Sequence, residues 1–151
     1  MNRTLALLAT LGSVAVLGGA LAFQHIGGLA PCDLCIDQRW PHAAAIAIGV
    51  ILLATGQRWL AGLGALAALV TSGIGAYHAG VEQGWWEGPS TCTSSNPGTL
   101  TADQLFDQIM AAPLVRCDDI AWQFLGLSMA GWNALLSLIL AVLWIAAARR
   151  G

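Results

Sequence analysis

Charged residues are scarce in this 151-residue chain, and lysine is missing altogether. Asp, Glu, Lys and Arg make up 9% of the sequence and hydrophobic residues 57%, whereas an ordinary soluble domain is about 25% charged. So few charges cannot cover a water-soluble globule, and the apolar composition also excludes a disordered chain. Since six Arg face eight Asp and Glu with no basic run, we expect no nucleic-acid partner. The composition predicts one membrane domain, residues 1–151.

Four apolar segments come near the length of a membrane helix, which needs about 20 residues. They are residues 4–23, 41–55, 60–77 and 123–148. The second has only 15 residues and contains His42, so it spans the bilayer only with its flanks. None shows the strict alternation of a β-barrel strand. The sequence therefore predicts an all-α, four-helix transmembrane bundle.

The few charges divide by sign between the two sides of this bundle. With the N-terminus inside, the cytoplasmic side receives Arg3, Arg58, Arg149 and Arg150 and no acid, while every acid falls outside. Because cytoplasmic loops are rich in Lys and Arg, we expect both termini in the cytoplasm and residues 24–40 and 78–121 outside. The first segment also resembles a secretory signal, but its apolar stretch exceeds the usual 7 to 15 or so residues, so we expect it to be retained.

The second outer segment contains the pattern of a short amphipathic helix. Thr101-Ala-Asp-Gln104 has the form of a capping box at a helix start. Apolar residues then share one face: Leu105, Phe106, Ile109 and Met110. Such a helix either lies on the membrane surface or packs against its own loop.

All four cysteines fall in the outer segments, Cys32 and Cys35 in the first and Cys92 and Cys117 in the second. If the membrane is a bacterial inner membrane, that side is oxidising and disulfides persist there. A C-x-x-C pair forms a small ring that is easily reduced and reoxidised, and a Cys92 to Cys117 bond would tie down the long loop. Four cysteines allow three pairings, among which the sequence does not choose.

Other interpretations of the C-x-x-C pair are less favoured. A c-type haem site needs His directly after the second Cys, where this chain has Ile36, and a thioredoxin-like fold needs a βαβ context. A four-cysteine zinc site is disfavoured by the wide spacing of the second pair. Two purely structural disulfides remain an alternative to thiol redox exchange.

A dithiol that is reoxidised at a membrane needs an acceptor for two electrons. The chain has no room for a flavin domain, so we expect a lipid-soluble acceptor between the helices. Arg39, four residues after Cys35, would stabilise a thiolate or hydrogen-bond a quinone carbonyl, or else serve as an interfacial anchor. His78, at the outer end of the third segment, would bind a quinone oxygen or lie in water at the membrane border.

Three motifs in this order resemble the disulfide bond formation protein B (DsbB) family over almost the whole chain. They are Pro31-Cys-Asp-Leu-Cys-Ile-Asp-Gln-Arg39, Tyr77-His-Ala-Gly-Val-Glu82 continuing to Glu87-Gly-Pro-Ser-Thr-Cys92, and Cys117-Asp-Asp-Ile-Ala-Trp-Gln-Phe-Leu-Gly-Leu-Ser-Met129. The resemblance implies a bacterial inner-membrane protein with its cysteines in the periplasm. Gln38 departs from the family pattern, since many relatives have Glu there.

The resemblance also implies a route for electrons. A reduced periplasmic DsbA-like dithiol oxidase attacks the Cys92–Cys117 disulfide at Cys92. The reduced Cys117 is then reoxidised by the Cys32–Cys35 pair. Cys35 then delivers the electrons to ubiquinone or menaquinone.

By position in the family pattern, Arg39 serves the quinone, and His78 is a looser match. Two alternatives are a membrane scaffold whose disulfides only brace the loops, and a thiol enzyme similar to vitamin K epoxide reductase.

Overall fold

The computed structural model describes residues 2–90, 92, 101–111 and 115–149 and is mostly helical. Its elements are α1 (Arg3–His25), α2 (Asp33–Asp37), α3 (Arg39–Thr55), α4 (Leu60–Glu82), α5 (Ala102–Ala111), β1 (Gln123–Phe124), β2 (Leu127–Ser128) and α6 (Met129–Arg149).

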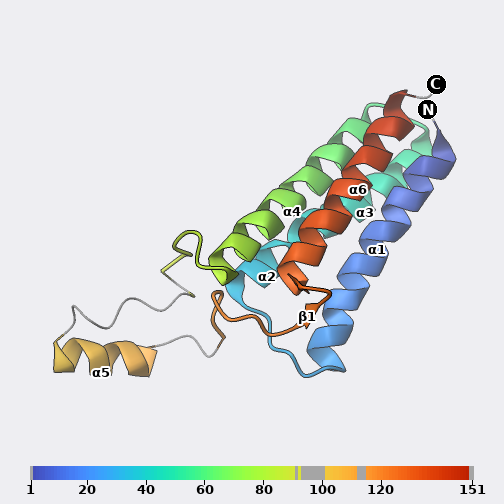
Figure 1. Cartoon of the computed structure of the whole chain (residues 1–151). Helices are drawn as coiled ribbons and strands as arrows, with labels where there is room; N and C mark the ends of the chain where they lie inside the picture. The colour runs from blue at the N-terminus through green and yellow to red at the C-terminus, as the bar shows by residue number, and fades with distance from the viewer. Residues whose placement is uncertain (1, 91, 93–100, 112–114, 150–151) are drawn as a thin grey trace.

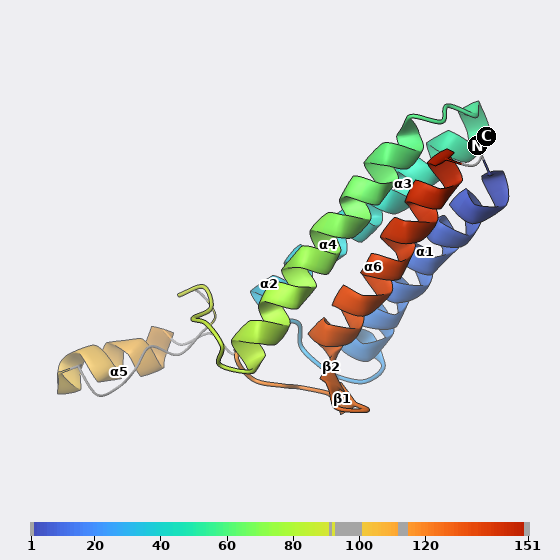
Figure 2. The ribbon, with the colours of Figure 1, turned by 45° about the horizontal axis from the view of Figure 1, so that its top comes forward.

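The helices α1, α3, α4 and α6 lie side by side in one bundle (Figures 1 and 2). Both chain ends lie at one end of the bundle, and α2 and the β1–β2 hairpin lie toward the other (Figure 1). α1, α4 and α6 are long and apolar enough to cross a membrane. α3 has 17 residues and packs along α1 and α4. The predicted helical fold is thus confirmed, with three clear candidate spans.

Small residues let the helices approach closely. A Cβ added at Gly64 of α4 would lie 2.6 Å from the ring of Trp144 on α6, and one at Gly49 of α3 would collide with the Thr10 side chain of α1. Trp144 is fully buried. Close contact at small residues is how helices associate where lipid is as apolar as the side chains.

The structure corrects several predicted boundaries. α4 continues past residue 77 to Glu82, so His78 belongs to a helix and the outer segment begins later. α3 begins at Arg39 rather than at residue 41, because Pro41 lies in the first helical turn, where N–H groups have no intrahelical partner. α1 extends one residue earlier and two residues later than predicted.

The largest error is at the start of the last helix. Residues 123–128, predicted as helix, form a two-stranded antiparallel hairpin in which Gln123 pairs with Ser128. Leu125 and Gly126 both have positive φ, 50° and 80°, as a tight two-residue hairpin turn requires. The Trp132 indole N–H donates to the Phe124 carbonyl at 3.0 Å and holds the hairpin against α6.

The helix α5 begins directly after Thr101, as the capping-box pattern predicts. It lies away from the bundle in both views (Figures 1 and 2). Phe106 and Met110 on its apolar face are exposed. Both interpretations of this helix, membrane surface or own loop, stay predictions.

Candidate thiol-disulfide site

The short helix α2 holds the C-x-x-C pair. Cys32 is its N-cap residue, and the Cys35 backbone N–H donates to the Cys32 Sγ at 3.2 Å. Asp33 occupies the first turn, where the helix dipole stabilises a negatively charged carboxylate. Cys32 is buried, Cys35 is partly exposed, and both are free thiols.

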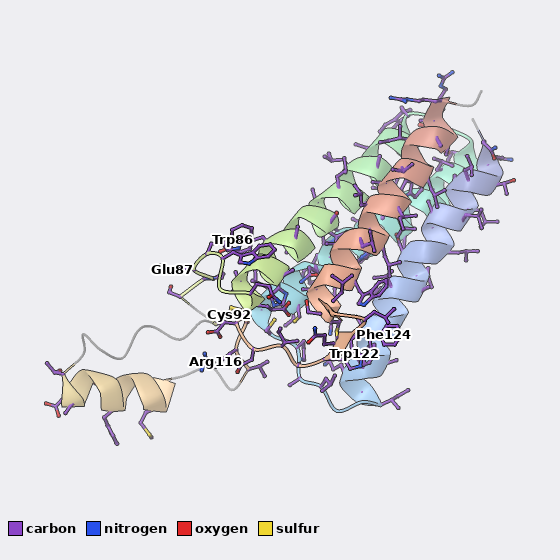
Figure 3. The ribbon with its side chains drawn as sticks, viewed as in Figure 1. Trp86, Glu87, Cys92, Arg116, Trp122 and Phe124 are labelled. Atoms are coloured by element: carbon purple, nitrogen blue, oxygen red, sulfur yellow. A yellow bond between two sulfur atoms is a disulfide. The ribbon has the colours of Figure 1, made fainter. Side chains whose placement is uncertain are left out.

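Cys92 and Cys117 form a disulfide, with their Cα atoms 5.3 Å apart. The Cys117 N–H donates to the Cys92 carbonyl at 2.6 Å. Both residues are buried in one cluster with Cys32, Leu34 and Val81, and Figure 3 shows Cys92 near the end of α4. The fold therefore brings the two cysteine pairs together and selects one of the three pairings. Cys92 and Cys117 are bonded to each other in this structure, so neither sulfur is a thiolate that could ligate zinc.

His78 lies between the two pairs and is 3% exposed, so of the two alternatives for His78, the one that places it in water at the membrane border is wrong. Its Nε2 is 3.1 Å from the Cys117 carbonyl oxygen, and its Nδ1 is 2.9 Å from the Gln38 Nε2. A backbone carbonyl only accepts, so Nε2 carries the proton of the neutral ring and Nδ1 accepts from Gln38. The same Nε2 is 3.6 Å from the Cys32 Sγ.

Gln38 links this histidine to a polar network inside the bundle. Its Nε2 also donates to the Leu34 carbonyl at 2.9 Å, and its Oε1 accepts from the Asn133 Nδ2 at 2.7 Å. The Asn133 Oδ1 in turn lies 3.0 Å from the His42 Nε2. Polar side chains at membrane depth are costly unless they pair with one another, and these residues join α2, α3, α4 and α6.

Glu82 is a further buried acid at the site that the sequence analysis did not single out. Its side chain is 5% exposed, and its Oε1 lies 3.8 Å from the His78 Nε2. Its Oε2 has no hydrogen-bond partner among the residues that the structure describes. Four polar residues of this site lie within or beside apolar segments of the sequence: Gln38, His42, Glu82 and Asn133. Their polarity at those positions is the sequence feature that points to a functional role.

A cavity of about 490 Å³ adjoins the thiols. Its walls are mostly apolar residues of α1 and α6, and Cys35, Arg39, His78 and Glu82 line its thiol end. Arg39 donates from one guanidinium nitrogen to the Gln24 Oε1. Its Nε is buried and, within the described part of the chain, has no hydrogen-bond partner.

The two thiols differ in acidity. A hydrogen bond from Cys32 lowers the pKa of Cys35, and Arg39 lowers that pKa further, although burial and Glu82 oppose the shift. The same hydrogen bond, together with burial, raises the pKa of Cys32. Cys35 is thus the group that ionises, and Cys32 keeps its proton.

The ligand atoms of Cys32, Cys35 and His78 lie within 4.8 Å of one another, close enough to share a metal ion. A metal on the His78 Nε2 would remove the proton donated to Cys117 and place it on Nδ1, where Gln38 already donates. The hydrogen-bond network therefore disfavours a metal at this site.

Comparisons with known proteins identify the family of this chain. A family model described as "Disulfide bond formation protein DsbB" matches residues 2–147. The chain is similar to "Disulfide bond formation protein B" of Verminephrobacter eiseniae, with 35% identity over 99% of this chain and 87% of that protein. It is also similar to the protein of the same name from Paracidovorax citrulli, with 34% identity over 98% of this chain and 89% of that protein. A third relative is "Disulfide bond formation protein B 2" of Pseudomonas aeruginosa, with 31% identity over 87% of this chain and 82% of that protein. On this match, the chain belongs to the DsbB family of bacterial membrane proteins that form disulfide bonds.

Proposed function

We propose that this disulfide-forming oxidoreductase reoxidises a periplasmic DsbA-like dithiol oxidase and passes the electrons to membrane quinone. The observation that carries the proposal is the placement of two cysteine pairs in one cluster, next to a cavity between the helices. The Cys92–Cys117 disulfide receives the partner's electrons, and the Cys32–Cys35 pair forwards them. The reduction potential of a DsbA-type oxidant is about −120 mV, so its reoxidation needs an electron acceptor of high potential.

The residues around the cavity fit a quinone. Its ring and isoprenoid tail are apolar apart from two carbonyl acceptors, and the cavity walls are mostly apolar. The buried Nε of Arg39 is a donor with no protein partner in the described residues, as a carbonyl oxygen would need. When bound, ubiquinone or menaquinone supplies a two-electron, two-proton acceptor.

The chain's own residues prepare the dithiol for this transfer. Arg39 stabilises Cys35 as the thiolate, which is the reactive form. The hydrogen bonds from Gln38 and to Cys117 fix the His78 ring beside the Cys32 Sγ. Burial of Cys32 keeps water and foreign thiols from its sulfur.

We further propose that α3 is a fourth span in a bacterial inner membrane, with the cysteines on the periplasmic side. Arg3, Arg58 and Arg149 belong to the same end of the bundle as the chain termini, while α2 lies toward the other end (Figure 1). The positive-inside rule places the arginine end in the cytoplasm.

A reconstituted assay tests the proposed function. Purified protein, a reduced thioredoxin-like oxidase and a short-chain ubiquinone should give quinone-dependent loss of the oxidase thiols. Cys32→Ser should abolish turnover while the Cys92–Cys117 bond still forms. Absence of quinone-dependent oxidation by the unmodified protein would refute the proposed enzymatic activity. A C-x-x-C disulfide that resists mild reductant would favour the alternative of a membrane scaffold whose disulfides only brace the loops.

A second experiment identifies the partner. In a Cys117→Ser variant, Cys92 is a free thiol that can attack the disulfide of the oxidised partner, and because its own disulfide partner Cys117 is gone, the mixed disulfide should persist. Mass spectrometry of the trapped adduct should place a periplasmic dithiol oxidase on Cys92. Capture on Cys32 instead would contradict the proposed order of transfer.

A further inference from the structure

Oxidising the dithiol requires the proton on Cys32 to leave. Cys32 is buried, and the hydrogen bond that its thiol donates to Cys35 raises the pKa of Cys32. The acceptor must be a group near the thiols with a free lone pair, because water has little access to the sulfur.

Most of the ionisable groups near the thiols are poorly placed to take this proton. His78 already carries its proton on Nε2, and its Nδ1 accepts from Gln38. Arg39 and Arg116, which also line the cavity, are cations. Asp119 is exposed and pairs with Arg116 at 3.6 Å.

His42 has a buried Nδ1 without a hydrogen-bond partner in the described residues, but it lies one helical turn deeper, beyond Arg39, and its Nε2 bonds to Asn133 and Ser137 of α6, not to the thiols or His78. Glu82 alone combines burial, a position beside His78 and the cavity, and an oxygen, Oε2, without a hydrogen-bond partner in the described residues.

We propose that Glu82 is the proton acceptor for the Cys32–Cys35 dithiol when it is oxidised. Cys35 enters as the thiolate and Cys32 as the thiol. As the S–S bond forms, two electrons pass to the acceptor, the Cys32 S–H bond breaks, and its proton moves to the Glu82 carboxylate directly or through a water. Glu82 then releases that proton to the reduced acceptor, whose second proton comes from solution. With quinone as the acceptor, this inference rests on the proposed function.

The proposal has an unusual experimental signature. The negative charge of Glu82 opposes ionisation of Cys35. A Glu82→Gln variant should therefore ionise Cys35 more readily and yet oxidise the dithiol more slowly. Damage to the fold does not predict this pair of opposite effects.

The experiment uses the full chain with the Cys32–Cys35 pair selectively reduced. Its oxidation is followed separately with a short-chain ubiquinone and with oxidised glutathione, by quenched alkylation and mass mapping of each cysteine. Glu82→Gln should slow oxidation by about 100-fold with both oxidants, and Glu82→Asp should restore most of the rate. Glu87→Gln, which removes an exposed acid of the same segment, should behave as the unmodified protein. In the same samples, the pH profile of Cys35 alkylation in Glu82→Gln should move to lower pH.

Two results would overturn the assignment of Glu82: oxidation of Glu82→Gln at the unmodified rate with either oxidant, or an alkylation profile that stays in place or moves to higher pH. If the unmodified protein reacts with oxidised glutathione but not with ubiquinone, the proposed function fails while the glutathione measurement still tests Glu82.

Discussion

Single residues around the C-x-x-C pair divide its two thiols into distinct roles. Cys35 is partly exposed, lines the cavity and is the thiol whose pKa is lowered. Cys32 is buried and keeps its proton. The hydrogen bond from Cys32 is the main cause that lowers the pKa of Cys35, and the positive charge of Arg39 lowers that pKa further.

Removing that charge should be visible in the chemistry of the reduced protein. A group whose pKa is lowered is ionised above that pKa and loses its charge as the pH falls through it. In Arg39→Gln the iodoacetamide reaction of Cys35 should therefore require a higher pH than in the unmodified protein. Arg39→Lys should keep the original profile. Identical profiles for Arg39→Gln and the unmodified protein would show that Arg39 does not act on Cys35.

Part of this site could be predicted from local sequence. The spacing of Cys32, Cys35 and Arg39 places them on adjacent turns, so their proximity is a local property. The hydrogen bonds of His78 could not be predicted, because Gln38 and the Cys117 carbonyl come from segments 40 and 39 residues away. Glu82 was missed for a related reason: only the extension of α4 beyond residue 77 places this acid inside the site.

At the scale of elements, close contacts at glycine determine how the helices pack. Gly64 gives α4 its contact with the Trp144 ring of α6, whereas a Cβ at Gly62, on the same helix, would meet nothing within 4 Å. The two positions thus differ in packing while sharing a helix and a residue type.

This difference gives a matched pair of variants. Gly64→Ala should lower the free energy of unfolding by about 1 to 3 kcal/mol, since the added methyl must displace a buried ring. Gly62→Ala should leave stability unchanged or slightly raised, because Ala favours the helix. Thermal unfolding in detergent measures both. Equal melting temperatures for the two variants would contradict the packing at Gly64.

The hairpin before α6 shows why element type was misjudged there. Residues 123–128 are largely apolar and continue into the helical pattern, so composition favours one long helix. The backbone at Leu125 and Gly126 adopts positive φ, which breaks the helix, and the Trp132 hydrogen bond to Phe124 stabilises the alternative. Neither the turn conformation nor this hydrogen bond is visible in the apolar periodicity of the sequence.

At the scale of the whole molecule, Arg3, Arg58 and Arg149 lie at the end of the bundle opposite the cysteines. The Arg3 guanidinium donates to the Leu53 carbonyl at 2.9 Å at the end of the bundle that holds the termini. The thiol pair and the disulfide occupy the other end. The orientation in the membrane therefore decides which compartment supplies the thiol substrate.

Introduced cysteines can test that orientation. Gln57 and Gln83 are both exposed and lie at opposite ends of α4. A membrane-impermeant maleimide should label Gln83→Cys in intact cells and Gln57→Cys only after lysis, with the unmodified protein as the background. Labelling of Gln57→Cys in intact cells would reverse the proposed topology.

The carbonyl of Cys117 has one more consequence. It accepts the His78 proton while its own residue is half of the outer disulfide. The same Nε2–H lies 3.6 Å from the Cys32 sulfur and 3.8 Å from a carboxylate oxygen of Glu82, so two further acceptors are next to it. One imidazole N–H therefore links the outer disulfide, the inner thiol pair and the buried acid, so a change at any of the three alters the hydrogen bonding of the other two.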